Sequence, residues 1–270
     1  MKSIFLCCVL VLLSTPALAQ IDSTQMDAET GELVFIHSLG SSANVWEEMV
    51  PYFQGTYDVW TYELPGHGTT KPMPGLTIET AAGDLERYLQ TNDIDYPILI
   101  GHGMGGLIAM RYAFDHPAEV RLLVVLDATP KQLATDEQKV HVTEQLLADY
   151  DRFVAAHYLH MSPSPEITDA LIDQALRTDS SSFVSLLLSS FDFDLTEELP
   201  RQAVPILVVG SGLFFPDAES VEIRLAEIGF SQARTISFKR MANTGHYMML
   251  EQPVYLASVI LAFIISQSRR

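Results

Sequence analysis

IGHGMGG, residues 100–106, decides the fold of this chain. It follows YPILI at 96–100, an apolar run of strand length, and precedes a segment at 107–114 whose apolar residues recur with helical spacing. Glycine carries no Cβ, so a glycine-rich turn lets the two segments approach closely. The stretch therefore predicts a strand, a tight turn centred on Gly103 and a helix.

Other apolar runs of strand length lie on both sides of this turn. They occupy residues 32–37, 57–62, 121–127 and 204–209, with a weaker candidate at 233–238. Helical spacing appears between them, at 78–91 and from residue 252 onward. Short apolar strands that alternate with helices are typical of a parallel sheet covered on both faces. The sequence predicts an α/β fold with a mostly parallel central sheet and helices on both of its faces.

The pattern changes between residues 131 and 200. No strand-like run occurs there, whereas helical spacing occurs at 137–158 and 167–176. We expect this block to form a helical lid beside the carboxyl ends of the strands; an ordinary pair of packing helices is the alternative. The core of the fold would then comprise residues 20–130 and 201–270.

The first 19 residues have the composition of a secretory signal peptide. Lys2 gives a positive start, residues 4–13 are continuously apolar, and Ala17-Leu18-Ala19 forms a small-x-small cleavage site. The apolar run is shorter than a bilayer-spanning helix requires, and no second run of that length follows. We therefore expect a secreted or periplasmic protein after cleavage, without a membrane span.

Charge and cysteine content narrow the function classes. The 270 residues include 34 acidic and 16 basic side chains, a net charge of −18, and nucleic-acid binding needs the opposite sign. The two cysteines, Cys7 and Cys8, both lie in the signal peptide, and the eight histidines show no metal-ligand spacing. We expect a small-molecule ligand, no nucleic acid, no metal and no cofactor. The sequence does not indicate an oligomeric state.

A glycine-rich turn after a strand can also cradle the phosphates of a dinucleotide. Gly101, Gly103 and Gly106 fit that fingerprint, and Asp127 is the nearby acid at a strand end that would hold a ribose. The fingerprint normally follows a strand near the start of its domain, whereas here it follows the third. We do not favour a nucleotide site.

Four segments, in this order, resemble the α/β-hydrolase family over residues 30–268. They resemble its H-G-x-G loop, its D-x-x-G-x-G turn, its G-x-S-x-G nucleophile elbow and the loop of its catalytic histidine. In this chain they read HSLGSS at 37–42, ELPGHG at 63–68, GHGMGG at 101–106 and NTGH at 243–246, the last followed by LEQP at 250–253. The resemblance implies the α/β-hydrolase fold and relates the chain to serine hydrolases of carboxylic esters.

The resemblance also implies roles for individual residues. His246 occupies the position of the general base, and the backbone amides of Met104 and Leu39 occupy those of the oxyanion hole. Gly103 occupies the position of the nucleophilic serine and has no side-chain atom that could attack a carbonyl. Ser38 is a second departure, because the family usually has glycine there.

The acid that would orient His246 has two candidates. The turn at 210–217, GSGLFFPD, has no acid where the family usually places one, and Asp217 comes later, where a carboxylate would cap the next helix. Asp127 ends the strand at 121–127, where some family members place their acid. The sequence leaves both Asp217 and Asp127 as candidates for the acid that orients His246.

Three functions are compatible with these features. We favour a pseudoenzyme that binds a small apolar or ester-like ligand, because both the serine and the usual acid are absent. The second is a hydrolase or lyase in which His246 acts as a base without an acyl-enzyme. The third is a serine hydrolase whose nucleophile was replaced by Gly103. Apolar residues expected near the pocket mouth are Trp46, Met104, Phe214, Phe215, Tyr247, Met248 and Met249, although such residues more often belong to a core.

Overall fold

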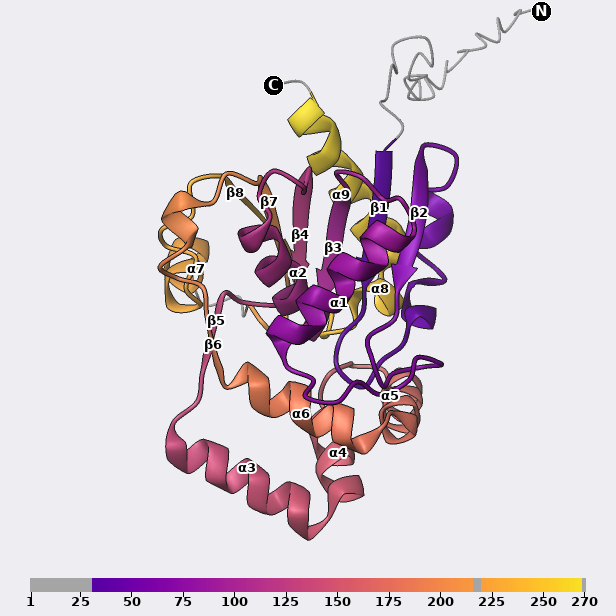
Figure 1. Cartoon of the computed structure of the whole chain (residues 1–270), viewed down its shortest axis with the longest axis vertical. Coiled ribbons are helices and arrows are strands. Elements are labelled where there is room, and N and C mark those ends of the chain that lie inside the picture. The colour runs from indigo at the N-terminus through magenta and orange to yellow at the C-terminus, as the bar shows by residue number, and fades with distance from the viewer. Residues whose placement is uncertain (1–30, 216–219, 269–270) are drawn as a thin grey trace, which may run out of the picture.

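The computed structural model describes residues 31–215 and 220–268, and these contain a six-stranded sheet (Figure 1). Its strands lie in the order β2-β1-β3-β4-β7-β8, and every neighbouring pair is parallel. Their bounds are β1 (Gly31–Ile36), β2 (Tyr57–Tyr62), β3 (Ile98–His102), β4 (Leu122–Leu126), β7 (Ile206–Ser211) and β8 (Ile236–Met241). The predicted parallel sheet is confirmed.

The central strands are buried along their whole length, which is why their sequences are continuous apolar runs. All residues of β3, β4 and β7 are buried, as expected for parallel strands covered on two faces. The weak candidate at 233–238 corresponds to β8 at the edge of the sheet, where half-buried and exposed positions alternate and the apolar signal is therefore weaker.

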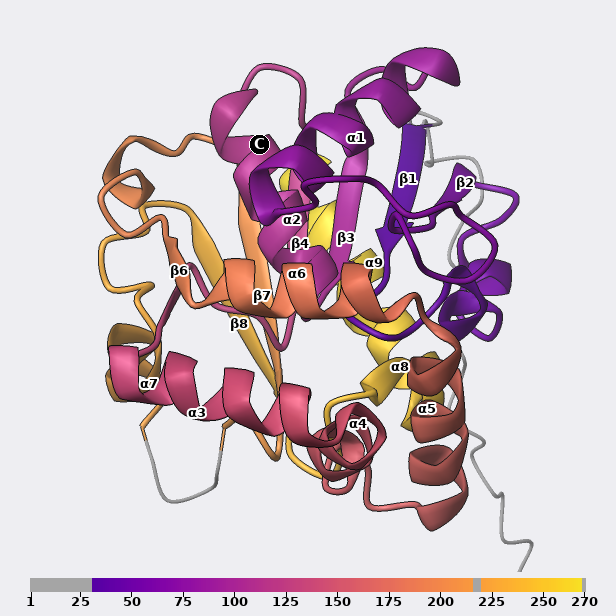
Figure 2. The same cartoon turned by 60° about the horizontal axis from the view of Figure 1, so that its bottom comes forward.

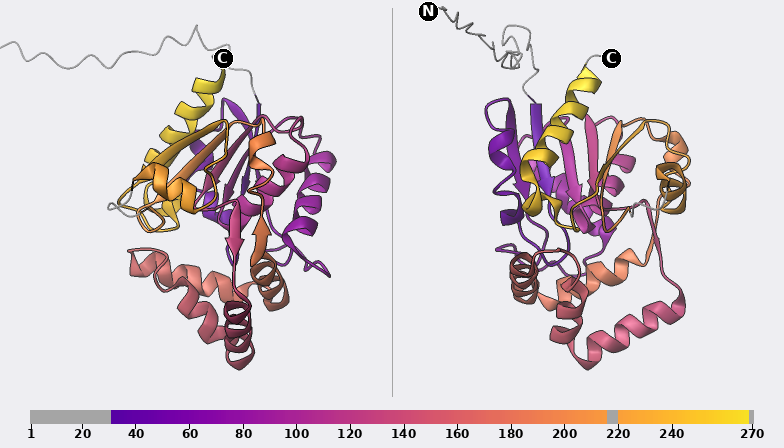
Figure 3. Two further views of the ribbon diagram at one scale, coloured as in Figure 1. Left: turned by 90° about the vertical axis from the view of Figure 1, so that its left-hand side faces the viewer. Right: turned by 180° about the vertical axis from the view of Figure 1, so that it is seen from behind.

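Helices cover both faces of the sheet (Figure 3). The helices α1 (Ile78–Thr91) and α2 (Met104–Asp115) pack on one face and α9 (Pro253–Ser268) on the other. Thr77 caps α1: its hydroxyl accepts a hydrogen bond from the Thr80 amide, which satisfies one of the free donors at the helix start. Two shorter helices, α7 (Val221–Glu227) and α8 (Met248–Glu251), and 3-10 turns at Ala43–Trp46, Val50–Tyr52 and Leu199–Arg201 complete the core.

Four helices lie at the end of the sheet where the strands finish (Figure 1 and Figure 2). They are α3 (Asp136–Ala148), α4 (Tyr150–Tyr158), α5 (Pro165–Arg177) and α6 (Ser180–Ser190). The expected single helix at 137–158 is interrupted at Asp149, whose extended backbone ends α3 and whose side chain caps α4 by accepting from the Arg152 amide. The chain therefore changes direction within this block, and its role as a lid stays a prediction.

The expectation that residues 131–200 contain no strand is wrong. A two-stranded antiparallel ladder joins β5 (Lys131–Leu133) to β6 (Asp192–Asp194) at the two ends of the block. Each strand has three residues and faces mostly solvent, so neither has the apolar run by which a strand is detected in sequence.

Some predictions fall on residues outside the described ranges. These are the signal peptide at 1–19 with Cys7 and Cys8, and Asp217. Within the described ranges, no helix is both long and apolar enough to cross a membrane.

Candidate active site

The turn at Gly103 connects β3 to α2 in the geometry that the sequence predicts. Gly103 has φ +50° and ψ −117°, a left-handed conformation that a residue with a side chain adopts only under strain. A Cβ on Gly105 would collide with the carbonyl oxygens of Ile36 and His37. The glycines therefore let the start of α2 lie directly against the end of β1, and residue 103 faces the space above the sheet.

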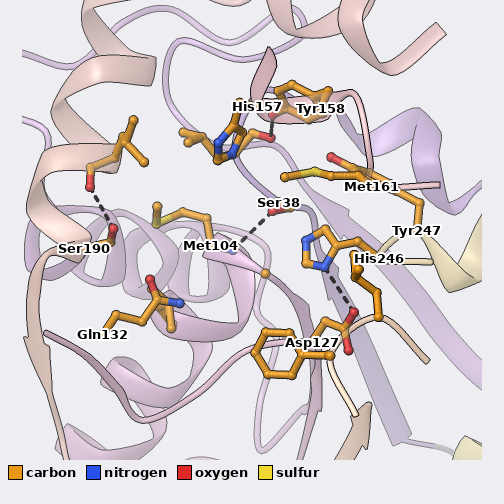
Figure 4. A pocket seen from close by; sticks show the side chains of 16 residues that line it. Ser38, Met104, Asp127, Gln132, His157, Tyr158, Met161, Ser190, His246 and Tyr247 are labelled. Atoms are coloured by element: carbon orange, nitrogen blue, oxygen red, sulfur yellow. Dashed lines mark hydrogen bonds and ion pairs between the residues drawn. The ribbon is translucent and has the colours of Figure 1, made fainter. Parts of the chain in front are cut away.

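His246 lies in the loop between β8 and α8 and lines a cavity (Figure 4). Its backbone amide donates to the Met161 carbonyl at 2.6 Å, in the turn after α4. The carbonyl of His246 accepts a hydrogen bond from Nε2 of His102 at 3.0 Å. Two elements thus hold the backbone of His246, while its ring, 14% exposed, faces the cavity.

Asp127 is the acid that reaches His246. Its Oδ2 lies 3.1 Å from Nδ1 of His246, and its Oδ1 accepts the Ser211 amide at 2.7 Å. Asp127 has φ +45°, an uncommon conformation outside glycine that persists where surrounding contacts enforce it. The last residue of β7, just before the turn that lacks the expected acid, contributes the amide that fixes the carboxylate at the end of β4. Asp217 lies outside the described residues.

His102, which precedes the turn, is a structural partner of His246. The two rings lie 4.3 Å apart between centroids, and complete burial lowers the pKa of His102 well below its ordinary value. His102 is therefore neutral, with its Nε2 proton donated to the His246 carbonyl. His102 is not among the site residues that the sequence predicts.

The two residues whose amides are expected in the oxyanion hole, Met104 and Leu39, both line the cavity. The Met104 amide donates to the Ser38 hydroxyl at 3.3 Å. The Leu39 carbonyl accepts from the Tyr158 hydroxyl at 2.5 Å, so α4 holds the loop after β1. His37 anchors the same loop from beneath: its Nε2 accepts the Leu64 amide at 3.1 Å, and burial lowers its pKa to about 4.

The cavity above these residues has a volume of about 330 Å³. Most of its wall is apolar, and its apolar lining residues are Leu39, Met104, Leu107, Met161, Leu187, Leu213 and Phe214. Of the residues expected near the mouth, Met104, Phe214 and Tyr247 line the cavity. The other four, Trp46, Phe215, Met248 and Met249, are buried in the core. A cavity of this size and character accommodates a small, largely apolar molecule.

Four polar residues of the cavity were not singled out from the sequence. They are Gln132, Ser190, His157 and Tyr158. Burial, and secondarily the nearby His246, lowers the pKa of His157 to about 4, so His157 is neutral at physiological pH. No sequence motif marks these residues, because only the packing of the helical block against the sheet brings them over Gly103.

The side chains do not support the nucleotide alternative. Both oxygens of Asp127 already accept hydrogen bonds, from Ser211 and His246, so this carboxylate is not free to hold a ribose. Among residues 31–215 and 220–268, no group of three or more histidine, cysteine or acidic side chains has a geometry that suits a metal ion.

Comparison with known sequences identifies related hydrolases. Residues 32–163 match the family model described as alpha/beta hydrolase fold. A pimeloyl-[acyl-carrier protein] methyl ester esterase of Vibrio atlanticus (strain LGP32) is 29% identical over 198 residues, 65% of this chain and 73% of the relative. The 3-oxoadipate enol-lactonase 2 of Acinetobacter baylyi is 25% identical over 189 residues, 67% of this chain and 71% of the relative.

Solved structures show the same fold at lower identity. The enol-lactonase from Burkholderia xenovorans LB400 superposes with a TM-score of 0.76 at 20% identity, covering 87% of this chain and 92% of the other. A thermophilic esterase from Thermogutta terrifontis gives 0.76 at 20% identity, covering 88% and 92%. The strand order, the turn at Gly103, the match over residues 32–163 and these likenesses agree: the chain has the α/β-hydrolase fold.

Proposed function

We propose that this protein hydrolyses small, largely apolar carboxylic esters or lactones, with His246 as general base. The observation that supports this proposal most directly is the contact between Asp127 Oδ2 and His246 Nδ1 at 3.1 Å. A carboxylate on Nδ1 fixes the tautomer in which Nε2 has a free lone pair, and it stabilises the imidazolium that forms when Nε2 takes a proton. The names of the relatives, an ester esterase and an enol-lactonase, support this substrate class.

The nucleophile does not come from residue 103. Gly103 stands where the family resemblance places the reactive serine, so an acyl-enzyme cannot form at this position. His246 must instead deprotonate another hydroxyl, of which water is the simplest. The amides of Met104 and Leu39 would donate to the carbonyl oxygen of the substrate as it becomes negative.

Binding without turnover is the second candidate, and the missing side chain at Gly103 is the observation that favours it. The sequence favours this function partly because the turn at 210–217 lacks the usual acid. The contact of Asp127 with His246 removes that reason. The cavity and both amides would serve a ligand carbonyl equally well without cleavage.

Two further features, one of the sequence and one of the structure, complete the proposal. The residues at 1–19 support export, with cleavage after Ala19. The helices α3 to α6 would form a lid, which is supported by the cavity-lining positions of His157, Tyr158 and Leu187 on them.

Turnover of short-chain nitrophenyl esters tests the proposal. We expect the parent protein to exceed the uncatalysed rate, and His246→Ala to lower kcat/KM by roughly 100-fold or more, because a positioned base contributes on the order of 100- to 10,000-fold. Asp127→Asn should lower kcat with little change in KM, because it disturbs the imidazole and not the cavity. His141→Ala, an exposed histidine on α3, is the matched control and should leave the rate unchanged.

Two results would contradict the proposed function. One is a parent rate equal to that of His246→Ala, which would show that His246 is not the base. The other is a parent that shows no turnover while a hydrolysis-resistant ketone analogue raises its thermal midpoint. The second result would support the binding function.

A further inference from the structure

The side chain of Ser38 lies where the side chain of residue 103 is missing. Ser38 comes from the loop after β1 and lines the cavity together with Gly103 and His246. A Cβ on residue 103 would overlap the Ser38 hydroxyl and would lie 3.0 Å from the Ser38 Cβ. The same point is 3.1 Å from His246 Nε2. One hydroxyl therefore occupies the space beside the base that a residue at 103 would occupy.

We propose that Ser38 supplies the nucleophile that position 103 lacks and forms the acyl-enzyme. This inference rests on the proposed function, and it replaces water by Ser38 in the first step. Serine and glycine are then exchanged between two positions of one site: Ser38 stands where the family usually has glycine, and Gly103 stands where it has serine.

The surroundings of the Ser38 hydroxyl suit this role. Its oxygen accepts the Met104 amide at 3.3 Å, so the hydroxyl proton stays available as a donor. His246 can accept that proton at Nε2, because its Nδ1 donates to Asp127. The backbone of Ser38 is fixed: its carbonyl accepts the Ser41 amide at 3.2 Å and Nδ1 of His37 at 2.8 Å. A rotation about the Cα–Cβ bond of Ser38 then moves only the hydroxyl, which places it toward the substrate or toward Met104.

Other serines near the site are less suitable. The second serine that lines the cavity, Ser190, donates its hydroxyl proton to the Leu187 carbonyl at 2.7 Å. Ser41 and Ser42 are buried in the same loop as Ser38 but are not among the residues that line the cavity.

The reaction balances with groups that the site contains. The Ser38 Oγ bonds to the carbonyl carbon and its proton passes to His246 Nε2, while the Met104 amide moves from the hydroxyl to the developing oxyanion. The carbon–oxygen bond to the alcohol then breaks, and His246 returns the proton to the alcohol. Water repeats the sequence on the acyl group, which releases the acid and regenerates the Ser38 hydroxyl.

A fluorophosphonate probe tests the inference without a known substrate. Attack by a serine hydroxyl forms an oxygen–phosphorus bond and expels fluoride, so the label marks the nucleophile. Cleavage after Glu32 and Glu47 gives a peptide of residues 33–47 that contains Ser38, Ser41 and Ser42, and fragmentation of this peptide by mass spectrometry identifies the labelled serine. The variants are Ser38→Ala, His246→Ala and, as the matched control, Ser42→Ala.

We expect a label on Ser38 that requires His246 and is present in Ser42→Ala. We also expect Ser38→Ala to abolish the pre-steady-state burst of nitrophenol and to lower turnover by roughly 100-fold or more, because loss of a nucleophile removes most of the rate in serine hydrolases. A label on Ser38 without measurable ester turnover would support the inference while contradicting the proposed function. Turnover that persists in Ser38→Ala, with no label on Ser38, would overturn the inference and leave the proposed function standing.

Discussion

At the scale of single residues, the site places a contacting pair, Asp127 and His246, beside the Ser38 hydroxyl. Asp127 and His246 are in contact, and the space above Gly103 is shared by the Ser38 hydroxyl and the edge of the His246 ring. Whether a serine at position 103 works therefore depends on the residue at position 38. This dependence distinguishes a site that has only lost the serine side chain at position 103 from a site that has been rearranged around a different serine.

Moving the hydroxyl back to the turn gives a prediction about paired residues. Gly103→Ser alone should gain little, because its Cβ would overlap the Ser38 hydroxyl. The double variant Gly103→Ser with Ser38→Gly should show a burst with nitrophenyl esters at least tenfold larger than that of Gly103→Ser alone, since the effects of substitutions at sites in contact are not additive. The fluorophosphonate label should move from residues 33–47 to Ser at position 103.

The control for this experiment makes the same exchange at a neighbouring position of the loop. Gly103→Ser combined with Ser42→Gly should behave like Gly103→Ser alone. If Gly103→Ser alone is already as active as the double variant, Ser38 rotates away at no cost, and the steric argument is wrong.

At the scale of elements, the helical block controls the upper wall of the cavity. The helix α4 ends in His157 and Tyr158, both of which line the cavity, and Tyr158 holds the Leu39 carbonyl. The turn after α4 supplies the Met161 carbonyl that accepts the His246 amide. The position of α4 therefore affects both the loop after β1 and the loop of His246, although no residue of α4 before its last turn lines the cavity.

The cap of α4 gives a prediction for an element. Asp149→Ala removes the carboxylate that accepts the Arg152 amide and should lower the free energy of unfolding by about 1 kcal/mol. Because α4 is held less firmly, KM for nitrophenyl esters should rise more than kcat falls. Asp169→Ala, an exposed acid inside α5, makes the same charge change without removing a cap. Equal effects of the two variants on stability and KM would contradict the capping argument.

At the scale of the whole molecule, buried neutral histidines make stability depend on pH. His37 and His67 are both fully buried, and burial, with the nearby His37 as a second cause at His67, lowers their pKa values to about 4 and about 3. In the unfolded chain these side chains titrate near 6.5. The unfolded chain therefore binds more protons below pH 6.5, so the stabilisation is complete above that pH and is lost as the pH falls.

Thermal or urea unfolding between pH 6.5 and pH 5 measures this loss. Each of the two histidines should contribute about 2 kcal/mol of destabilisation at pH 5, because one pKa unit corresponds to about 1.4 kcal/mol. His37→Asn or His67→Gln should lower the absolute stability but flatten the pH dependence. His141→Gln, which changes an exposed histidine, should keep the parent slope; an identical slope in all four proteins would show that other groups control the pH dependence.

The sequence by itself determined the fold, because each central strand of a parallel sheet is buried on both faces and is therefore a continuous apolar run. It also identified the turn at Gly103 and the position of His246, since tight turns and loop motifs depend on local residue types. The short ladder β5–β6 escaped detection because its strands are exposed and have no apolar pattern.

Only the tertiary structure decided how the site residues meet. Asp127 and His246 are separated by 119 positions in the chain, and the local sequence left two candidate acids open. The Ser38 side chain reaches the space above Gly103 because β1 and β3 are neighbours in the sheet and their carboxyl ends meet. Distances between side chains from different strands depend on the packing of the whole sheet, and no local pattern in the sequence encodes them.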